Sequence, residues 1–115
     1  MIKKIIISSA LALTFTNIAL ADAAAGKVKY DMLCASCHGL TGAADGPVAQ
    51  SLPEGSKPGN FQTGTYKFAT DETKFKELLR KGGAGVGLNP LMPPQSQLTD
   101  AEMSDVYAYI TSLKK

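Results

Sequence analysis

Length and charge set the first limits on this protein. The chain of 115 residues is long enough for one domain but not for two. It carries 12 basic and 10 acidic residues, and two of the lysines, Lys3 and Lys4, lie in an N-terminal leader, so the rest of the chain is neutral. A neutral domain without a basic stripe lacks the charge pattern of a nucleic-acid-binding protein.

Residues 1–21 have the pattern of an export signal. A short basic start precedes an apolar run over residues 5–15, and Ala19-Leu20-Ala21 supplies the small residues that a signal peptidase accepts. We expect cleavage after Ala21, which leaves residues 22–115 as the mature domain and places that domain in the periplasm. Ala23-Ala24-Ala25 offers a second cut site.

An uncleaved anchor helix is the alternative for this segment. Spanning a bilayer takes roughly 20 mainly apolar residues. The run from Ile5 to Leu20 is shorter and is interrupted by serines, threonines and Asn17. We therefore expect cleavage, and we expect the mature protein to meet membranes only through its partner complexes.

The mature chain begins with a segment that favours a helix, over residues 23–35. Val28, Met32 and Ala35 stand at the i, i+4, i+7 spacing of one helical face. The segment runs directly into the only two cysteines of the chain.

These cysteines belong to the sequence Cys34-Ala35-Ser36-Cys37-His38, which is the attachment pattern of a c-type haem. Two residues between the sulfurs let both reach the two vinyl-derived carbons on one edge of a porphyrin. The next residue then lies under the ring, where the His38 imidazole can bind the iron. We predict one haem c, attached covalently through Cys34 and Cys37, with its iron bound by His38.

Other uses of two cysteines at this spacing are less consistent with the chain. A thioredoxin-like dithiol sits in a strand–helix unit, and no β-rich pattern surrounds this one. A structural zinc site needs four ligands, whereas His38 is the only histidine and there is no third cysteine. A disulfide between such close residues constrains an unfolded chain very little. A chance match to a short pattern is the remaining alternative.

Residues 39–66 are rich in glycine and proline, for example in Asp45-Gly46-Pro47 and Lys57-Pro58-Gly59-Asn60, and this composition predicts a loop. So long an irregular stretch is unusual in a small domain. A buried haem resolves the difficulty, because the loop can pack on the cofactor, which supplies core that so short a chain lacks.

A second helix is predicted over residues 71–81, with Phe75, Leu78 and Leu79 facing inward and Gly82-Gly83 as its end.

The iron needs a second axial ligand, and elimination points to Met92. Met1 leaves with the leader, Met32 lies too close to the attachment cysteines, and Met103 falls on the apolar face of the last helix. Met92 lies in a loop over residues 85–94 that prolines stiffen, so its thioether can be held with little entropy left to lose. The alternative is a loop methionine that fills a gap, but a haem that lacks a distal ligand favours ligation.

A capping box, Thr99-Asp100-Ala101-Glu102, predicts where the last helix begins. Apolar residues follow at helical spacing, and Lys114 and Lys115 lie at the negative end of the helix dipole. These residues are Met103, Val106, Tyr107, Ile110 and Leu113. The prediction is an all-α domain of three or four helices joined by loops.

In this order of elements the sequence resembles a class I cytochrome c, over the whole of residues 22–115. The resemblance rests on Cys-Ala-Ser-Cys-His-Gly, a Gly-Pro loop, a middle helix, Met-Pro-Pro and a last helix ending Tyr109-Ile110-Thr111-Ser112-Leu113. It implies the class I fold, with its helices and loops wrapped around a single haem. Class II cytochromes carry the haem motif near the C-terminus of a four-helix bundle and fit poorly.

The resemblance also implies roles for further residues. The first and last helices of the family cross where a small residue meets an aromatic one, and Gly26 and Tyr109 match those positions, with Tyr30 nearby. The family's Gly-Pro supplies a carbonyl to the proximal imidazole. Gly46-Pro47 corresponds to it, so the Pro47 carbonyl is the implied partner of His38.

The match is weaker between residues 48 and 68. Tyr66 and Asn60 are the candidates there for contacting the haem propionates, and Phe61 and Phe68 are the candidates for packing on the haem.

Together these features predict a monomeric carrier of single electrons and not an enzyme. With His38 and Met92 as ligands the iron stays six-coordinate in both oxidation states, and thioether ligation favours the ferrous form. The expected partners are a donor reductase or dehydrogenase and an acceptor oxidase or reductase. Two alternatives stay open: a haem subunit fixed in a larger oxidoreductase, or a small-molecule-binding haem protein if Met92 is not a ligand.

Overall fold

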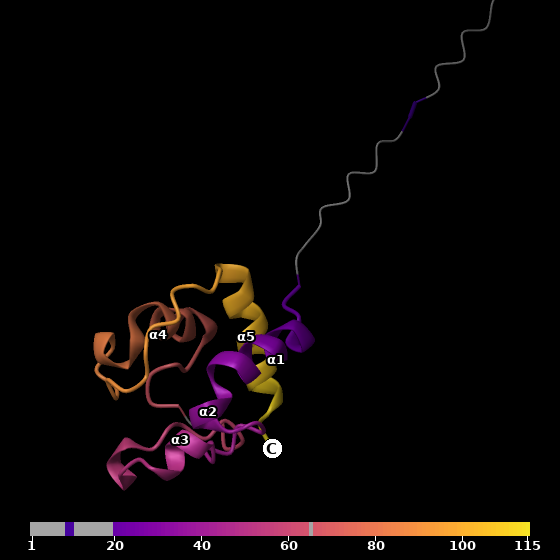
Figure 1. Cartoon of the computed structure of the whole chain (residues 1–115). Helices are drawn as coiled ribbons and strands as arrows, with labels where there is room; N and C mark the ends of the chain where they lie inside the picture. Colours follow the sequence, from indigo (N-terminus) through magenta and orange to yellow (C-terminus); the bar gives the residue numbers. More distant parts are fainter. Residues whose placement is uncertain (1–8, 11–19, 65) are drawn as a thin grey trace, which may run out of the picture.

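The structure is a computed structural model that describes residues 9–10, 20–64 and 66–115. The described residues form helices and loops without a strand, so the prediction of an all-α fold is confirmed (Figure 1). The elements are α1 (Ala23–Leu33), α2 (Ala35–His38), α3 (Pro47–Gln50), the 3-10 helix η1 (Glu54–Ser56), α4 (Glu72–Gly85) and α5 (Asp100–Ser112). The number of α-helices exceeds the predicted three or four because α2 and α3 are additional helices of a single turn.

Most of the leader predicted over residues 1–21 lies outside the described part of the chain. Within the described part, no helix has both the length and the apolar character needed to cross a membrane.

The buried face of α1 carries Gly26 and Tyr30, where the family resemblance places the crossing with the last helix, and not the apolar residues Val28 and Met32. Val28 and Met32 are 59% and 72% exposed, whereas Gly26 and Tyr30 are buried. The reason lies in how α1 meets α5. A Cβ atom on Gly26 would collide with the Asp105 carbonyl and lie 2.8 Å from the Val106 nitrogen, so the two backbones approach most closely where α1 has no side chain. That close approach decides which face of α1 is covered.

The crossing of α1 and α5 (Figure 1) is the main contact between helices of the fold. Tyr30 is fully buried, and its ring packs edge-on against Tyr109 with centroids 5.1 Å apart. The aromatic residue on α5 therefore pairs with Tyr30, while Gly26 meets the α5 backbone. Such an edge-to-face pair contributes about 0.5–1.5 kcal/mol beyond its buried area.

Helix α5 begins at the predicted capping box. The Thr99 hydroxyl accepts a hydrogen bond from the Glu102 backbone N–H at 3.1 Å, and the Thr99 N–H donates to the Glu102 carboxylate at 3.3 Å. These two bonds satisfy backbone donors that a helix start leaves without partners. Met103, Val106 and Ile110 then form the buried face of the helix.

Helix α4 buries Phe75, Leu78 and Leu79, as predicted from their spacing. The regular helix ends after Lys81, because Gly82 has a φ of 71° and leaves the helical conformation. One further turn continues to Gly85. The regular helix therefore stops at the predicted glycine pair, and the kink there is followed by one more turn.

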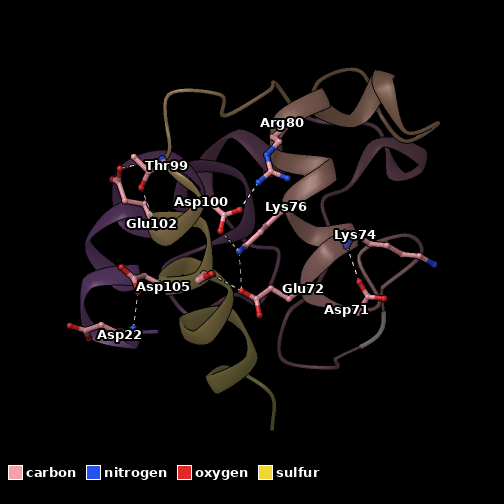
Figure 2. A network of polar contacts seen from close by, with 11 residues as sticks. Asp22, Asp71, Glu72, Lys74, Lys76, Arg80, Thr99, Asp100, Glu102 and Asp105 are labelled. Carbon is pink, nitrogen blue, oxygen red and sulfur yellow. Dashed lines mark hydrogen bonds and ion pairs between the residues drawn. The ribbon is translucent and has the colours of Figure 1, made fainter. Parts of the chain in front are cut away.

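Polar contacts hold the start of α5 against α4 (Figure 2). The Asp100 carboxylate accepts from the Lys76 ammonium at 2.8 Å and from the Arg80 guanidinium at 2.6 Å. Lys76 also lies 3.4 Å from Glu72, whose carboxylate accepts from the Ser104 hydroxyl at 2.6 Å. Single exposed pairs stabilise a fold little, but this network joins residues spread along α4 to the first turns of α5.

One apolar core lies between α1, α4 and α5. Its buried members are Tyr30, Ala35, Phe75, Leu79, Leu98, Met103, Val106 and Ile110. Cys34, Phe61 and Met92 are partly buried and pack against the edge of this core. Three of the residues predicted to contact a haem therefore gather at one core, although they lie far apart in the sequence.

Candidate functional site

The predicted attachment residues lie in a single helical turn. The Cys34 N–H donates to the Tyr30 carbonyl at 2.8 Å, which ends α1, and Cys34 is then the N-cap of α2. The His38 N–H donates to the Cys34 carbonyl at 2.9 Å, so these two residues stand one turn apart, where side chains lie on the same helix face. Cys34 and Cys37 are not joined in a disulfide, and both are partly buried. The turn thus presents two sulfurs and one imidazole.

Tyr30 ties the end of this turn back to α1. Its hydroxyl donates to the Gly39 carbonyl at 2.6 Å in the protein interior. Gly39 follows His38 with a φ of 86°, a conformation that favours glycine. Burial is the main cause that raises the pKa of the Tyr30 hydroxyl, so the group remains a neutral donor.

The His38 imidazole has a defined orientation. Its Nδ1 lies 2.9 Å from the Gly59 carbonyl oxygen, and its ring stacks on Phe61 with centroids 4.4 Å apart. Because a carbonyl only accepts hydrogen bonds, Nδ1 carries the proton and Nε2 keeps a free lone pair. Burial lowers the pKa of the imidazole, and the bond to Gly59 opposes that shift. The neutral ring is the form that binds a metal.

The partner of His38 differs from the one that the family resemblance implied. The implied group was the Pro47 carbonyl, but the imidazole hydrogen-bonds to Gly59. Gly46 and Pro47 are used instead to begin α3, with the Gly46 N–H donating to the Cys37 carbonyl at 3.2 Å. The chain reaches the imidazole only after passing through η1, and it does so at Pro58-Gly59, the other turn sequence in the same loop.

Phe61 and Tyr66 are brought to the same place as His38. The Phe61 ring contacts both the His38 ring and the Tyr66 ring, with centroids 4.4 and 5.9 Å away. Asn60 makes hydrogen bonds within the loop through both ends of its amide. Its Nδ2 donates to the Ala43 carbonyl at 3.4 Å, and its Oδ1 accepts from the Gln62 N–H at 2.9 Å. Phe68 is partly buried.

Met92 rests on the two glycines at the kink of α4, Gly82 and Gly83, which we call the glycine seat. The Gly83 N–H donates to the Met92 carbonyl at 2.9 Å. A Cβ atom on Gly83 would collide with the Asn89 carbonyl, and one on Gly82 would lie 2.9 Å from Pro94. The loop can lie this close to α4 only because neither residue has a side chain. From the sequence, Gly82-Gly83 is expected only to end a helix.

Asn89 supports the same loop from its other side. Its Nδ2 donates to the Ser56 carbonyl at 3.3 Å, and its Oδ1 accepts from the Leu91 N–H at 2.9 Å. The Met92 N–H donates to the Asn89 carbonyl at 3.1 Å. The backbone of Met92 is therefore bonded on both sides, to Asn89 and to Gly83.

The donor set fits a covalently bound haem. In the described part of the chain no group of three or more His, Cys, Asp or Glu side chains is placed to hold a metal ion. Burial, and then the neighbouring Cys37, raises the pKa of the Cys34 thiol to about 12, so a charged thiolate ligand is disfavoured there. A neutral thioether to a vinyl-derived carbon has no such cost. The free Nε2 of His38 and the thioether of Met92 are both ligands that haem iron accepts.

Comparison with known proteins agrees with this chemistry. The sequence profile of the Cytochrome c family matches residues 23–114. Cytochrome c-554(547) of Halothiobacillus neapolitanus is 34% identical over 94 residues, which cover 81% of this chain and 98% of that protein. The cbb3-type cytochrome c oxidase subunit CcoP of Azospirillum brasilense is also 34% identical, over 80% of this chain but only 30% of its own length.

A solved structure shares the fold. A chain of the reducing HAO-like protein complex of Kuenenia stuttgartiensis superposes with a TM-score of 0.67 and 30% identity, over 78% of this chain and 41% of that one. The family match extends from the first residue of α1 to the end of α5 and includes both cysteines, His38 and Met92. The protein is thus a class I c-type cytochrome of the cytochrome c family, whose members bind haem c covalently and use it in electron transfer.

Proposed function

We propose that this cytochrome is a periplasmic carrier of single electrons, with His38 and Met92 as the axial ligands of its iron. Bound haem iron supplies the one-electron couple. In this proposal Cys34 and Cys37 hold the cofactor, and the chain performs no catalysis of its own. A donor reductase or dehydrogenase and an acceptor oxidase or reductase are the proposed partners.

His38 contributes through its hydrogen bond to Gly59. The bond keeps the proton on Nδ1 at 2.9 Å from the carbonyl and leaves Nε2 for the iron. A carbonyl partner also fixes the plane of the ring and increases its basicity as a ligand. Phe61, stacked on the ring, limits its rotation further.

The observation that carries the proposal is the hydrogen bond from Gly83 to the Met92 carbonyl, at 2.9 Å. It holds the backbone of Met92 while its side chain packs against the core that also borders Cys34. A ligand held in this way has little freedom to leave or return when the charge of the iron changes. A carrier needs this property, since a site that moves little exchanges electrons readily.

The same proposal includes export and processing. Residues 1–21 would be the cleaved signal, and residues 22–115 the mature, monomeric domain. Two observations support this division: α1 is capped by the Asp22 side chain, and the family match begins at residue 23. The cytochrome c-554(547) relative also has about the length of such a single domain, since the match covers 98% of it.

The optical spectrum of the purified holoprotein tests the ligand assignment. We expect a low-spin ferric form with the weak red band of thioether–iron ligation, and little change on adding imidazole at low concentration. A high-spin ferric spectrum would show an open distal position. That result would favour the alternative of a small-molecule-binding haem protein.

A second candidate is a haem subunit that stays in a larger oxidoreductase. It is favoured by the likeness to parts of CcoP and of the HAO-like complex protein, of which the matches cover 30% and 41%. Size-exclusion chromatography of a native periplasmic extract separates the two candidates. We expect the haem protein to elute as a small monomer at low and at high salt, because carrier interfaces are small and short-lived. Elution with one large complex at every salt concentration would establish the subunit instead.

A further inference from the structure

The first residue of the proposed mature domain makes a contact across the helix crossing. The backbone N–H of Asp22 donates to a carboxylate oxygen of Asp105 on α5, at 2.8 Å (Figure 2). The Asp22 side chain meanwhile caps α1 by accepting from the N–H groups of Ala24 and Ala25, at 2.9 and 3.2 Å. One residue therefore both starts α1 and joins it to α5.

Cleavage after Ala21 would change the chemistry of this contact. Hydrolysis adds water across the Ala21–Asp22 peptide bond: the hydroxyl goes to the carbonyl carbon of Ala21 and the hydrogen to the nitrogen of Asp22. The new amine takes up one more proton at neutral pH, since the pKa of an α-amino group is ordinarily about 7.7–8.0. A neutral N–H facing Asp105 thus becomes an ammonium facing Asp105. The ammonium adds the attraction of two opposite charges to a hydrogen bond that a carboxylate already accepts.

The surroundings favour a cation at this nitrogen. Asp22, Asp100 and Asp105 line a hollow of about 420 Å³ between the start of α1 and the start of α5, together with Leu20 and Ala21, which cleavage after Ala21 would remove. Asp100 is already bonded to Lys76 and Arg80 of α4.

The nearest lysines on α1 are also engaged. Lys27 pairs with Asp31, and Lys29 pairs with Glu102 of α5 at 2.8 Å. Among the described residues no ion pair involves Asp105. The positive end of the α1 dipole disfavours a cation at the first residue, so Asp105 is the group that would offset this repulsion.

We propose that cleavage after Ala21 creates an ion pair between the Asp22 α-ammonium and the Asp105 carboxylate, which strengthens the α1–α5 crossing only in the processed protein. The inference rests on the proposed export and cleavage. It also distinguishes the two cut sites, because cleavage after Ala25 would remove the Asp22 cap together with its contact.

Asp105→Asn in two backgrounds tests the pair on exported holoprotein. The first background is the natural sequence. The second has one alanine inserted between Ala21 and Asp22, so that cleavage after Ala21 leaves the ammonium one residue away and restores a peptide N–H at Asp22. The insertion would not move the cut, since a shifted site would need the large Leu20 where the peptidase takes a small residue. Intact mass establishes each N-terminus.

We expect Asp105→Asn to lower the melting temperature at pH 7 by about 2–4 °C more in the natural background than in the insertion background. Pairing raises the pKa of the α-amino group, so its stabilisation is complete below the ordinary value and is lost as pH rises through the raised one. The excess should therefore vanish near pH 10. As a control, Glu77→Gln removes the exposed pair with Lys81, at 2.9 Å on α4, and should act equally in both backgrounds.

Two results would overturn the inference, and they are distinguishable. An N-terminus other than Asp22 removes its premise, cleavage after Ala21, without affecting the axial-ligand assignment, which the spectrum tests separately. An N-terminus at Asp22 with equal effects of Asp105→Asn in both backgrounds shows that cleavage occurs but that no ion pair forms.

Discussion

Replacing Met92 by alanine should leave the haem attached and open the iron to exogenous ligands. Cys34 and Cys37 hold the cofactor independently of Met92, so the yield of holoprotein should change little. The apparent affinity for imidazole scales with the fraction of molecules whose distal position is open. If that fraction is at most about a tenth in the natural protein, imidazole should bind the variant at least about tenfold more tightly. The reduction potential should fall, because the thioether no longer favours the ferrous form.

The measurements are the ferric spectrum, an imidazole titration and a potentiometric titration. Met32→Ala is the matched control, since it makes the same change at a methionine that is 72% exposed on α1. We expect Met32→Ala to keep the red band, the affinity and the potential of the natural protein. If Met92→Ala also kept all three, the axial ligand would be another group, and the role of the glycine seat would be confined to stability.

Local sequence was enough to predict the chemistry of attachment. Cys34, Cys37 and His38 lie within one turn, so their mutual arrangement follows from the helical backbone alone. The capping box at Thr99 and the buried face of α5 are equally local and were predicted for the same reason. Such elements can be predicted without knowing which segments pack against them.

The second half of the site depends on contacts between distant segments. His38 bonds to Gly59 because of the path that the loop takes through α3 and η1, and two Gly-Pro or Pro-Gly turns in that loop look alike in sequence. The apolar spacing in α1 does not indicate its buried face, which the approach of the α5 backbone at Gly26 decides; only the family resemblance points to Gly26. Such backbone contacts leave no periodic signal in the sequence.

Gly26→Ala should destabilise the protein severely, although alanine is the better helix former. In an ordinary helix interior the change would stabilise by roughly 0.5–1 kcal/mol. Here the added methyl group would collide with the Asp105 carbonyl and lie 2.8 Å from the Val106 nitrogen, and a backbone cannot rotate away as a side chain can. The two helices would have to separate, which loosens the packing of Tyr30 on Tyr109 as well.

We expect the steric effect to exceed the gain in helix propensity, with a loss of about 3 kcal/mol or more in the free energy of unfolding. For a domain of this size that corresponds to a melting temperature lower by about 12 °C or more. Gly55→Ala is the matched control, because a Cβ atom there has nothing within 4 Å; it should change the stability by less than about 1 kcal/mol. Denaturant unfolding of both holoproteins measures the difference. Equal stabilities of the two variants would mean that the α1–α5 crossing can accommodate a methyl group at Gly26. The close backbone contact there would then not be what selects the buried face of α1.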